Sequence, residues 1–313
     1  MNHYLDRRRR VAAELISLVY IVIIAEIAIA TGALYVLFPE LGALSHEIFT
    51  RPRGSWARAP FLLVITPVMT ALLGTFVTRY VPYGYLSVMV TVAGPLAIVL
   101  GLRSPIAPAI SAGLLPLTLG VTSWWYPPGI VFGTALLAIL STIWKQFAVA
   151  PPNGTVASRD EDTTPGAESW WSIAALMLLV VIAVTVVELT HLRFVLFPPL
   201  VVIGFEMFVH TRHCPWANRI ASLPIVCVLT ASGGFLCRHY LGIGPRASLV
   251  AMAWGVLLLR AFDLHVPPAL AVALLPQVMG SPTILYPVAV GIGTSLMAVS
   301  FALYSRIARQ FLE

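Results

Sequence analysis

Charged side chains and a histidine precede a proline pair in the second half of the chain. Arg260, Asp263 and His265 lie within six residues, and Pro267 and Pro268 follow them directly. A helix that begins at such prolines inside a membrane would present unpaired N–H groups and the positive end of its dipole, which attract anions. We therefore interpret Arg260, His265 and the helix start at Pro268 as groups that favour a small anion. The structural alternative is an interfacial salt bridge between Arg260 and Asp263, with His265 as a cap or loop residue.

The first half of the chain carries a partial counterpart of this motif. Arg103 and Pro108 occupy the positions that correspond to Asp263 and Pro268. No arginine or histidine matches the other two polar groups. Arg103 and Pro108 are nevertheless expected to belong to the same substrate path.

A pair of carboxylates, Glu47 and Glu206, stands at matched positions in the two halves. A carboxylate inside a membrane costs about 2.5 to 3.5 kcal/mol on insertion scales, so it usually faces the protein interior and serves a function. We include both glutamates in the expected path. The alternative is that each forms a solvated ion pair with the basic loop beside it, at residues 51–53 and 212–213.

The elements that must position these residues form an internal repeat. When the sequence is shifted by 160 residues, Pro108–Leu136 aligns with Pro268–Leu296, and 11 of the 29 positions are identical. Shared apolar composition alone would give about three identities. Upstream, at an offset of 159, Val36–Pro39 matches Val195–Pro198 and Trp56 is matched by Trp216 after one further shift. The chain therefore consists of two homologous units.

The composition requires a membrane environment for this repeat. The chain is 59% hydrophobic and 10% charged, with a mean hydropathy of +0.90, so its apolar surface could not be covered in water. About 20 apolar residues cross a bilayer as a helix. The expected spans are residues 11–37, 60–80, 85–102 and 126–147, then 170–197, 220–241, 247–262 and 284–307.

Four apolar segments are too short to cross a bilayer. They cover residues 39–49, 105–120, 198–208 and 265–280 and begin at or near proline, and the longer pair ends at glycine. Such segments at matched positions of two halves are typical of a transporter's binding site. We predict broken or re-entrant half-helices, although Pro116 and Pro276 could instead kink full spans. The fold expected is all-α: a polytopic membrane protein with two homologous halves of four to five transmembrane helices each.

The domain organisation follows from these segments. Residues 11–147 form the first transmembrane repeat, 148–169 a flexible acidic linker, and 170–307 the second repeat. With four crossings per half the repeats are parallel, and with five they are inverted. Both arrangements place the two termini in the cytoplasm, and the Arg7–Arg10 run favours the same side.

Several functional classes lack support in the sequence. Motifs of hydrolases, metalloproteases, P-loop proteins and dinucleotide-binding proteins are missing, so we expect neither an enzyme nor a cofactor. Three cysteines without a paired spacing indicate neither a disulfide framework nor a metal site. The net charge of +6 reflects membrane orientation rather than a nucleic-acid partner. The expected partners are lipid and a small anion, with homo-oligomerisation left open.

The second half resembles HPP-family integral membrane proteins. The resemblance lies in residues 215–219 (Pro-Trp-Ala-Asn-Arg), Leu264–Ala269, and Tyr286–Val288 with two following glycines. Val266 interrupts the His-Pro-Pro motif, and the matching segment of the first half, Ile106–Ala109, has no histidine. Some family members of plants and cyanobacteria transport nitrite. The resemblance therefore implies a cell inner-membrane transporter or channel for a small inorganic anion such as nitrite. The competing hypothesis is a non-transporting membrane scaffold or sensor; a lipid-modifying enzyme is a third, weaker one.

Overall fold

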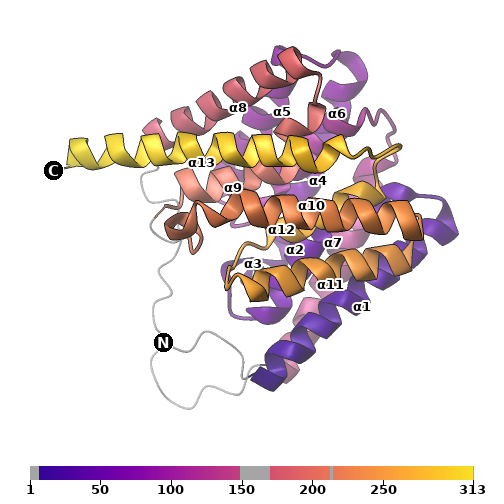
Figure 1. Cartoon of the computed structure of the whole chain (residues 1–313). Helices are drawn as coiled ribbons and strands as arrows, with labels where there is room; N and C mark the ends of the chain where they lie inside the picture. The colour runs from indigo at the N-terminus through magenta and orange to yellow at the C-terminus, as the bar shows by residue number, and fades with distance from the viewer. Residues whose placement is uncertain (1–6, 149–169, 212–213, 313) are drawn as a thin grey trace.

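The computed structural model describes residues 7–148, 170–211 and 214–312, and the regular elements in these ranges are helices (Figure 1). The first half contains α1 (Arg7–Thr31), α2 (Glu40–Thr50), α3 (Ser55–Arg58), α4 (Pro60–Tyr80), α5 (Tyr85–Gly101), α6 (Pro108–Leu119) and α7 (Tyr126–Ala148). The second half contains α8 (Trp170–Thr190), α9 (Pro198–Phe208), α10 (Ser222–Leu241), α11 (Pro245–Ala261), α12 (Pro268–Leu274) and α13 (Leu285–Leu312). Short 3-10 helices lie at η1 (Leu34–Val36), η2 (Arg193–Leu196), η3 (Ala217–Arg219) and η4 (Leu275–Gln277).

The outer surface of this bundle is apolar. Within the described ranges, five helices, α1, α4, α7, α8 and α13, are long and apolar enough to cross a membrane. Exposed aromatic side chains stand at their ends, such as Phe61 at 72%, Trp125 at 76% and Trp170 at 83% exposure. Tryptophan is enriched where helices leave the hydrocarbon core. The predicted all-helical protein with several membrane-length helices is thus confirmed for the described residues.

Two of the predicted spans extend too far along the chain. The helix expected over 11–37 ends at Thr31, and the one expected over 170–197 ends at Thr190. Gly32 (φ 68°) and His191 (φ 58°) are left-handed, a conformation that terminates helices. Of the residues that follow, 36–37 and 195–197 are buried, and Ala33, Tyr35, Leu192 and Phe194 are partly buried and pack against the core. The linker expected over 148–169 lies, apart from Ala148, outside the described residues.

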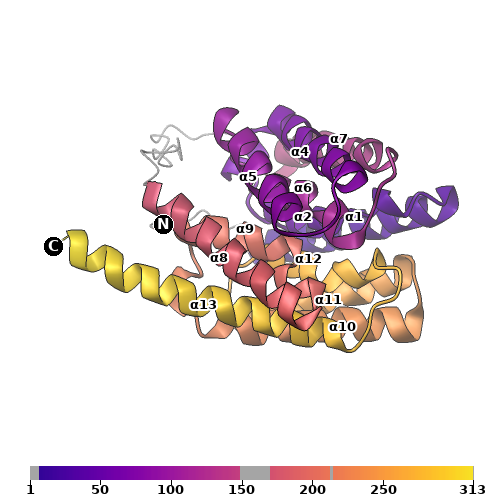
Figure 2. The same cartoon turned by 90° about the horizontal axis from the view of Figure 1, so that it is seen from above.

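The four segments predicted as short helices are short in the structure. They form α2, α6, α9 and α12, the last continued by η4 to Gln277. Nearly all of their residues are buried, and Figure 2 shows them between the longer helices. Pro116 lies within the 12-residue α6, so at this position the proline does not kink a full span. The apolar character of these segments reflects burial in protein rather than contact with lipid.

The depth at which α6 begins can be measured against its neighbour α4. The hydroxyl of Thr70 donates a hydrogen bond to the carbonyl oxygen of Ala109 at 2.6 Å. Thr70 is the central residue of the 21-residue α4, so the first turn of α6 lies about 15 Å from either end of that helix. Beyond the end of α6, Arg79 donates to the carbonyl oxygen of Thr122 at 3.1 Å. α6 therefore runs alongside the second half of α4 only.

Contacts of the first half recur about 160 residues later. Gly74 of α4 packs so closely on α6 that a Cβ atom there would overlap the carbonyl group of Gly113. Gly234 of α10 packs on Ala273 of α12 in the same way. A glycine is needed at each crossing because the two backbones touch. The short helix is thus held against a long one by the same kind of contact in each half.

A buried tyrosine hydrogen bond is repeated with the same spacing. The hydroxyl of Tyr126 donates to the carbonyl oxygen of Ala112 at 2.9 Å, and that of Tyr286 donates to Val272 at 2.7 Å. We expect Tyr126→Phe and Tyr286→Phe each to lower the free energy of unfolding by about 1 kcal/mol, since each removes one buried hydrogen bond. Denaturant unfolding in detergent micelles measures both losses. A loss in only one variant would show that the two bonds are not equivalent.

The two halves meet through their short helices (Figure 2). α2 packs against α12, and α6 packs against α9, while α1 contacts α11 and α5 contacts α8. Gly42 of α2 brings that helix onto Leu270 and Leu274 of α12. One hydrophobic cluster therefore extends through both halves, and each half completes the core of the other.

Helix ends gather on one side of the molecule, which we name end A. Arg9 donates to the carbonyl oxygen of Ala148 at 3.4 Å, so α1 begins where α7 ends. Ser172 and Tyr304 share a hydrogen bond of 2.8 Å, so α8 begins beside the end of α13. The loops before α6 and α12 enter the interior from this end.

Candidate functional site

A polar cluster lies between the two halves at end A. We use this name for seven residues: Arg10, Glu14, His46, Glu47, Arg51, Arg260 and His265. They come from α1, α2, α11 and the turns that follow α2 and α11. The cluster contains three arginines and two glutamates, so formal positive charge exceeds negative charge even when both histidines are neutral.

The last turn of α2 supplies the first ion pair. Glu47 is 11% exposed at its side chain, and its Oε1 accepts a hydrogen bond from Nη1 of Arg51 at 3.0 Å. The two residues are four apart, the spacing at which helical side chains meet. α2 ends at Thr50 because Pro52 disfavours a helical conformation at the preceding residue. Arg51 therefore stands at the rim of the cluster, at 35% side-chain exposure.

The second half contributes His265 to the same carboxylate. His265 Nε2 lies 2.7 Å from Glu47 Oε2 and 3.4 Å from Arg51 Nη1. The Glu47 oxygen has no partner in hydrogen-bond geometry, so this contact is electrostatic and is attractive when the imidazole is protonated. His265 thus forms an electrostatic contact between the second half and α2.

The loop between α11 and α12 places His265 there. Asp263 is left-handed (φ 48°), and the N–H of Leu264 bonds back to the carbonyl oxygen of Leu259 at 2.9 Å, which closes α11. The chain then reverses into the interior, where Pro267 favours an extended conformation at the residue before it. This path carries His265 to the end of α2.

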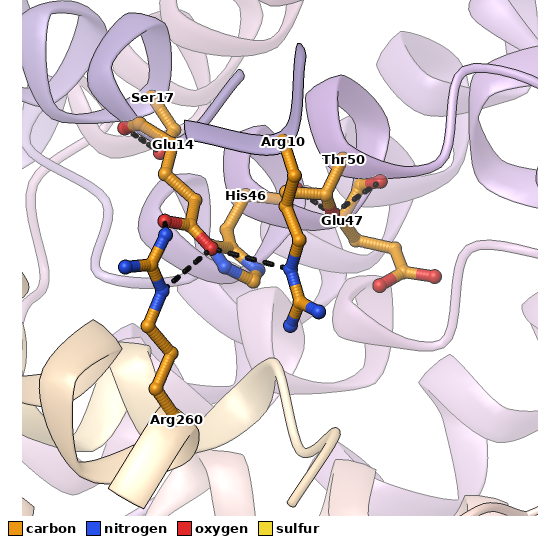
Figure 3. A network of polar contacts seen from close by, with 7 residues as sticks. All are labelled: Arg10, Glu14, Ser17, His46, Glu47, Thr50 and Arg260. Carbon is orange, nitrogen blue, oxygen red and sulfur yellow. Dashed lines mark hydrogen bonds and ion pairs between the residues drawn. The ribbon is translucent and has the colours of Figure 1, made fainter. Parts of the chain in front are cut away.

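Glu14 of α1 joins the halves a second time. Its carboxylate accepts two hydrogen bonds from Arg260: Nε lies 3.1 Å from Oε1, and Nη2 contacts Oε2. Arg10 Nε lies 3.5 Å from the same Oε1, one helical turn away. Figure 3 shows Glu14 between the two arginines. Paired contacts of this kind fix the geometry of both side chains, although Arg260 remains 44% exposed.

His46 lies at the centre of the polar cluster. It is 5% exposed, and its Nδ1 has no hydrogen-bond partner. Its ring is close enough to His265, Glu47, Arg10 and Arg260 to interact electrostatically with each of them. Figure 3 shows the ring beside the Glu14 carboxylate. His46 is thus a buried histidine close to the charged groups of both ion pairs.

The structure brings together only some of the residues predicted from the sequence. Glu47, Arg260 and His265 belong to the polar cluster. The proposed salt bridge between Arg260 and Asp263 is wrong, because the Asp263 side chain is 93% exposed and its partner is Arg219 at 3.4 Å.

The other predicted path residues lie outside the cluster. Arg103 is exposed in the loop that matches the Asp263 turn, with φ 47°. Glu206 pairs with His210 of the turn that follows α9 at 2.9 Å. Glu47 has the basic neighbour that the ion-pair alternative predicted, Arg51, but Glu47 is buried rather than solvated.

The expectation of free N–H groups at Pro108 and Pro268 is wrong. The N–H of Ala109 donates to Ile106 at 3.1 Å, and that of Ala269 donates to Val266 at 3.0 Å. The following residues, at positions 110 and 270, also donate to carbonyl oxygens three residues earlier. A tight turn ahead of each helix uses these donors, so neither start offers them to a solute.

Four members of the polar cluster escaped the sequence reasoning. In the sequence, Arg10 indicates membrane orientation and Arg51 belongs to a basic loop, while Glu14 and His46 match no motif. The spacing of Arg10 and Glu14 indicates a helical ion pair, but the approach of Arg260 from 246 residues away has no signal in one sequence.

Metal and thiol chemistry receive no support from the described part of the chain. No group of three or more histidine, cysteine or acidic side chains in those ranges could hold a metal ion. The three cysteines are unpaired and buried. Burial raises the pKa of the Cys214 thiol, in the loop after α9, to about 12, so this thiol is not a nucleophile near neutral pH.

No family model matches the chain, and neither a curated protein nor a solved structure is similar to it.

Proposed function

We propose that the protein is a transporter or channel for a small inorganic anion, nitrite being the substrate that the HPP-family resemblance implies. The observation that carries this proposal is the polar cluster, which joins the halves with an excess of arginine over glutamate. It lies where the loop to α12 leaves end A for the interior. A half-buried site rich in arginine suits an oxyanion, because guanidinium groups bind such ligands through paired hydrogen bonds.

The glutamates of the polar cluster would then act as tethered anions. Glu14 forms ion pairs with Arg260 and Arg10, and Glu47 forms them with Arg51 and, when the imidazole is protonated, with His265. An incoming anion carries the same charge as a carboxylate, so it can replace one as the partner of an arginine. The contacts of Glu14 with Arg260 and of Glu47 with His265 join the two halves. Replacement of either glutamate by an anion would therefore weaken the contact between the halves at end A.

The architecture proposed is two parallel homologous repeats, with the short helices meeting at the centre. Three observations support it: the repeated contacts of Gly74 and Gly234, the matched tyrosine hydrogen bonds, and the start of both α1 and α8 at end A. We place end A, with both termini, on the cytoplasmic side of the inner membrane because of the Arg7–Arg10 run.

Nitrite flux into liposomes tests the proposal. Vesicles that contain the wild-type protein should take up nitrite faster than empty vesicles. The double variant His265→Ala/Arg260→Ala removes two groups that can contact the anion and should be slower than wild type by at least about tenfold, the effect of losing one charge-assisted contact. Arg246→Ala removes an exposed charge at the opposite end of the molecule and should leave the flux unchanged. Equal flux in wild-type, double-variant and empty vesicles would contradict the proposal.

A second candidate, a non-transporting scaffold or sensor, is favoured by a different observation. α12 is entirely apolar, and Glu206 is the one charged residue of α9. A packed apolar centre is what a rigid docking platform requires. In that case the wild-type protein would give no flux above empty vesicles.

A further inference from the structure

A buried carboxylate lies deep in the first half, away from the polar cluster. Glu40, the first residue of α2, is 1% exposed, and neither of its carboxylate oxygens has a hydrogen-bond partner. The matching position of the second half is Pro199, so the repeat does not require an acid there.

The surroundings of Glu40 are almost entirely apolar. α6 places the Ser111 side chain beside it, though not in hydrogen-bond geometry. α7 contributes the titratable Tyr126, whose hydroxyl is already donated to a carbonyl oxygen. α1 contributes the buried Tyr20, whose hydroxyl donates to the carbonyl oxygen of Gly133 at 2.8 Å. Of the charged groups on the other packed elements, Glu26 of α1 is exposed, and α12 has none. The remaining charges of α1 and the Arg58 of α3 lie toward end A, at the other end of α2.

Glu40 is also far from both ends of the molecule. The next residue, Leu41, packs on Gly133, which is seven residues into α7 and therefore about 10 Å along that helix. Ser111 belongs to the first turn of α6, which begins at the midpoint of α4. At this depth and at 1% exposure, the carboxylate is out of contact with solvent in this packed arrangement.

The physical consequence concerns the proton of Glu40. An ionised carboxylate without a partner is very unfavourable in an apolar interior, and the protonated form is far less so. The packed arrangement of α2 therefore requires a proton on Glu40. Loss of that proton would favour any arrangement in which α2 shifts and water reaches the carboxylate.

We propose that Glu40 is a proton-binding site that couples anion movement to proton movement, so that one proton crosses with each anion. This inference rests on the proposed function and deepens it. The proton binds to a carboxylate oxygen of Glu40 on one side and leaves it on the other, and the net charge carried with a monovalent anion is zero. Transport should then respond to a pH gradient and not to the membrane potential.

The test uses proteoliposomes, nitrite and an imposed pH gradient, with empty vesicles subtracting entry of the uncharged acid. With one unit of lower pH outside, electroneutral symport drives about tenfold accumulation, and wild-type protein should speed the approach to it. Glu40→Gln should still exchange nitrite across the membrane but lose the acceleration by the gradient. Glu40→Asp keeps a carboxyl group and should retain it. Glu26→Gln, which changes an exposed acid of α1, should behave like wild type.

The outcomes separate the inference from the proposed function. Two results would overturn the coupling but not anion transport. In one, wild-type flux is independent of the pH gradient; in the other, the flux of Glu40→Gln responds to the gradient as strongly as that of wild type. No wild-type flux would overturn the proposed function and the coupling together. Infrared spectroscopy tests the proton-binding site independently of transport. Loss of a protonated carboxyl band in Glu40→Gln would support protonation of Glu40, and an unchanged spectrum would refute it.

Discussion

The Gly74→Ala variant is expected to lose about 3 kcal/mol of its free energy of unfolding, or to fail to fold. The added methyl group would overlap the carbonyl of Gly113, where α4 and α6 touch backbone to backbone. Neither helix can retreat, since Thr70 binds Ala109 one turn away. Overpacking in a well-packed core costs about 1 to 3 kcal/mol, and more when the clash is with backbone. Thermal unfolding in detergent micelles measures the loss.

Two other glycines provide the comparison for Gly74→Ala. Gly234→Ala introduces the same clash with Ala273 and should cost a similar amount. Gly101→Ala places its methyl group in open space at the exposed end of α5, so its effect should stay within about 0.5 kcal/mol. If Gly74→Ala were as stable as Gly101→Ala, the close packing of α6 on α4 would be incorrect.

The second large effect is expected for Glu47→Ala, at about 2 to 3 kcal/mol. This substitution removes the carboxylate that Arg51 and His265 share, and leaves two nitrogen groups 3.4 Å apart without a counter-ion. Removing one partner of a buried pair costs more than the pair itself contributes, because the other charge stays uncompensated. The exposure of Arg51 keeps the loss below that of a fully buried pair. Denaturant unfolding measures it.

Glu206→Ala is the matched control for Glu47→Ala. Glu206 occupies the equivalent place on α9 but contacts His210 of its own segment. We expect a loss of no more than about 1 kcal/mol, the usual contribution of an ion pair between near neighbours. Equal losses in the two variants would mean that the contact between Glu47 and His265 does not hold the halves together.

The short helices were predictable from sequence because proline marks where they begin. The prediction over residues 198–208 matches α9 at both ends, and those over 39–49 and 105–120 differ from α2 and α6 by one to three positions at each end. The segment predicted over 265–280 is shorter in the structure, as α12 (Pro268–Leu274) and η4 (Leu275–Gln277). The sequence prediction is wrong for residues 32–37 and 191–197, where apolar residues are assigned to lipid-facing helices. In this protein the same apolar character serves the inner core, and composition alone does not distinguish the two environments.

The candidate site was predictable in part. Glu47, Arg260 and His265 stood out because charged residues are rare in the apolar chain. Their partners depend on the tertiary fold: His265 reaches α2 because α11 closes at Asp263, and Glu14 reaches Arg260 because α1 packs on α11. Glu40 directly follows Pro39 at the start of α2. An acid in the first turn of a helix is usually close to water, so the sequence gives no sign that this one is buried.

The difference between α2 and α9 has a consequence for how such a chain can evolve. α2 carries Glu40, His46 and Glu47, while α9 is apolar apart from Glu206. A dimer of identical subunits must carry every substitution twice, so an unpaired buried acid would burden both copies. In the two-repeat architecture that we propose, both repeats belong to one polypeptide and this restriction is absent. One repeat can then acquire buried charged groups while the short helix of the other stays apolar.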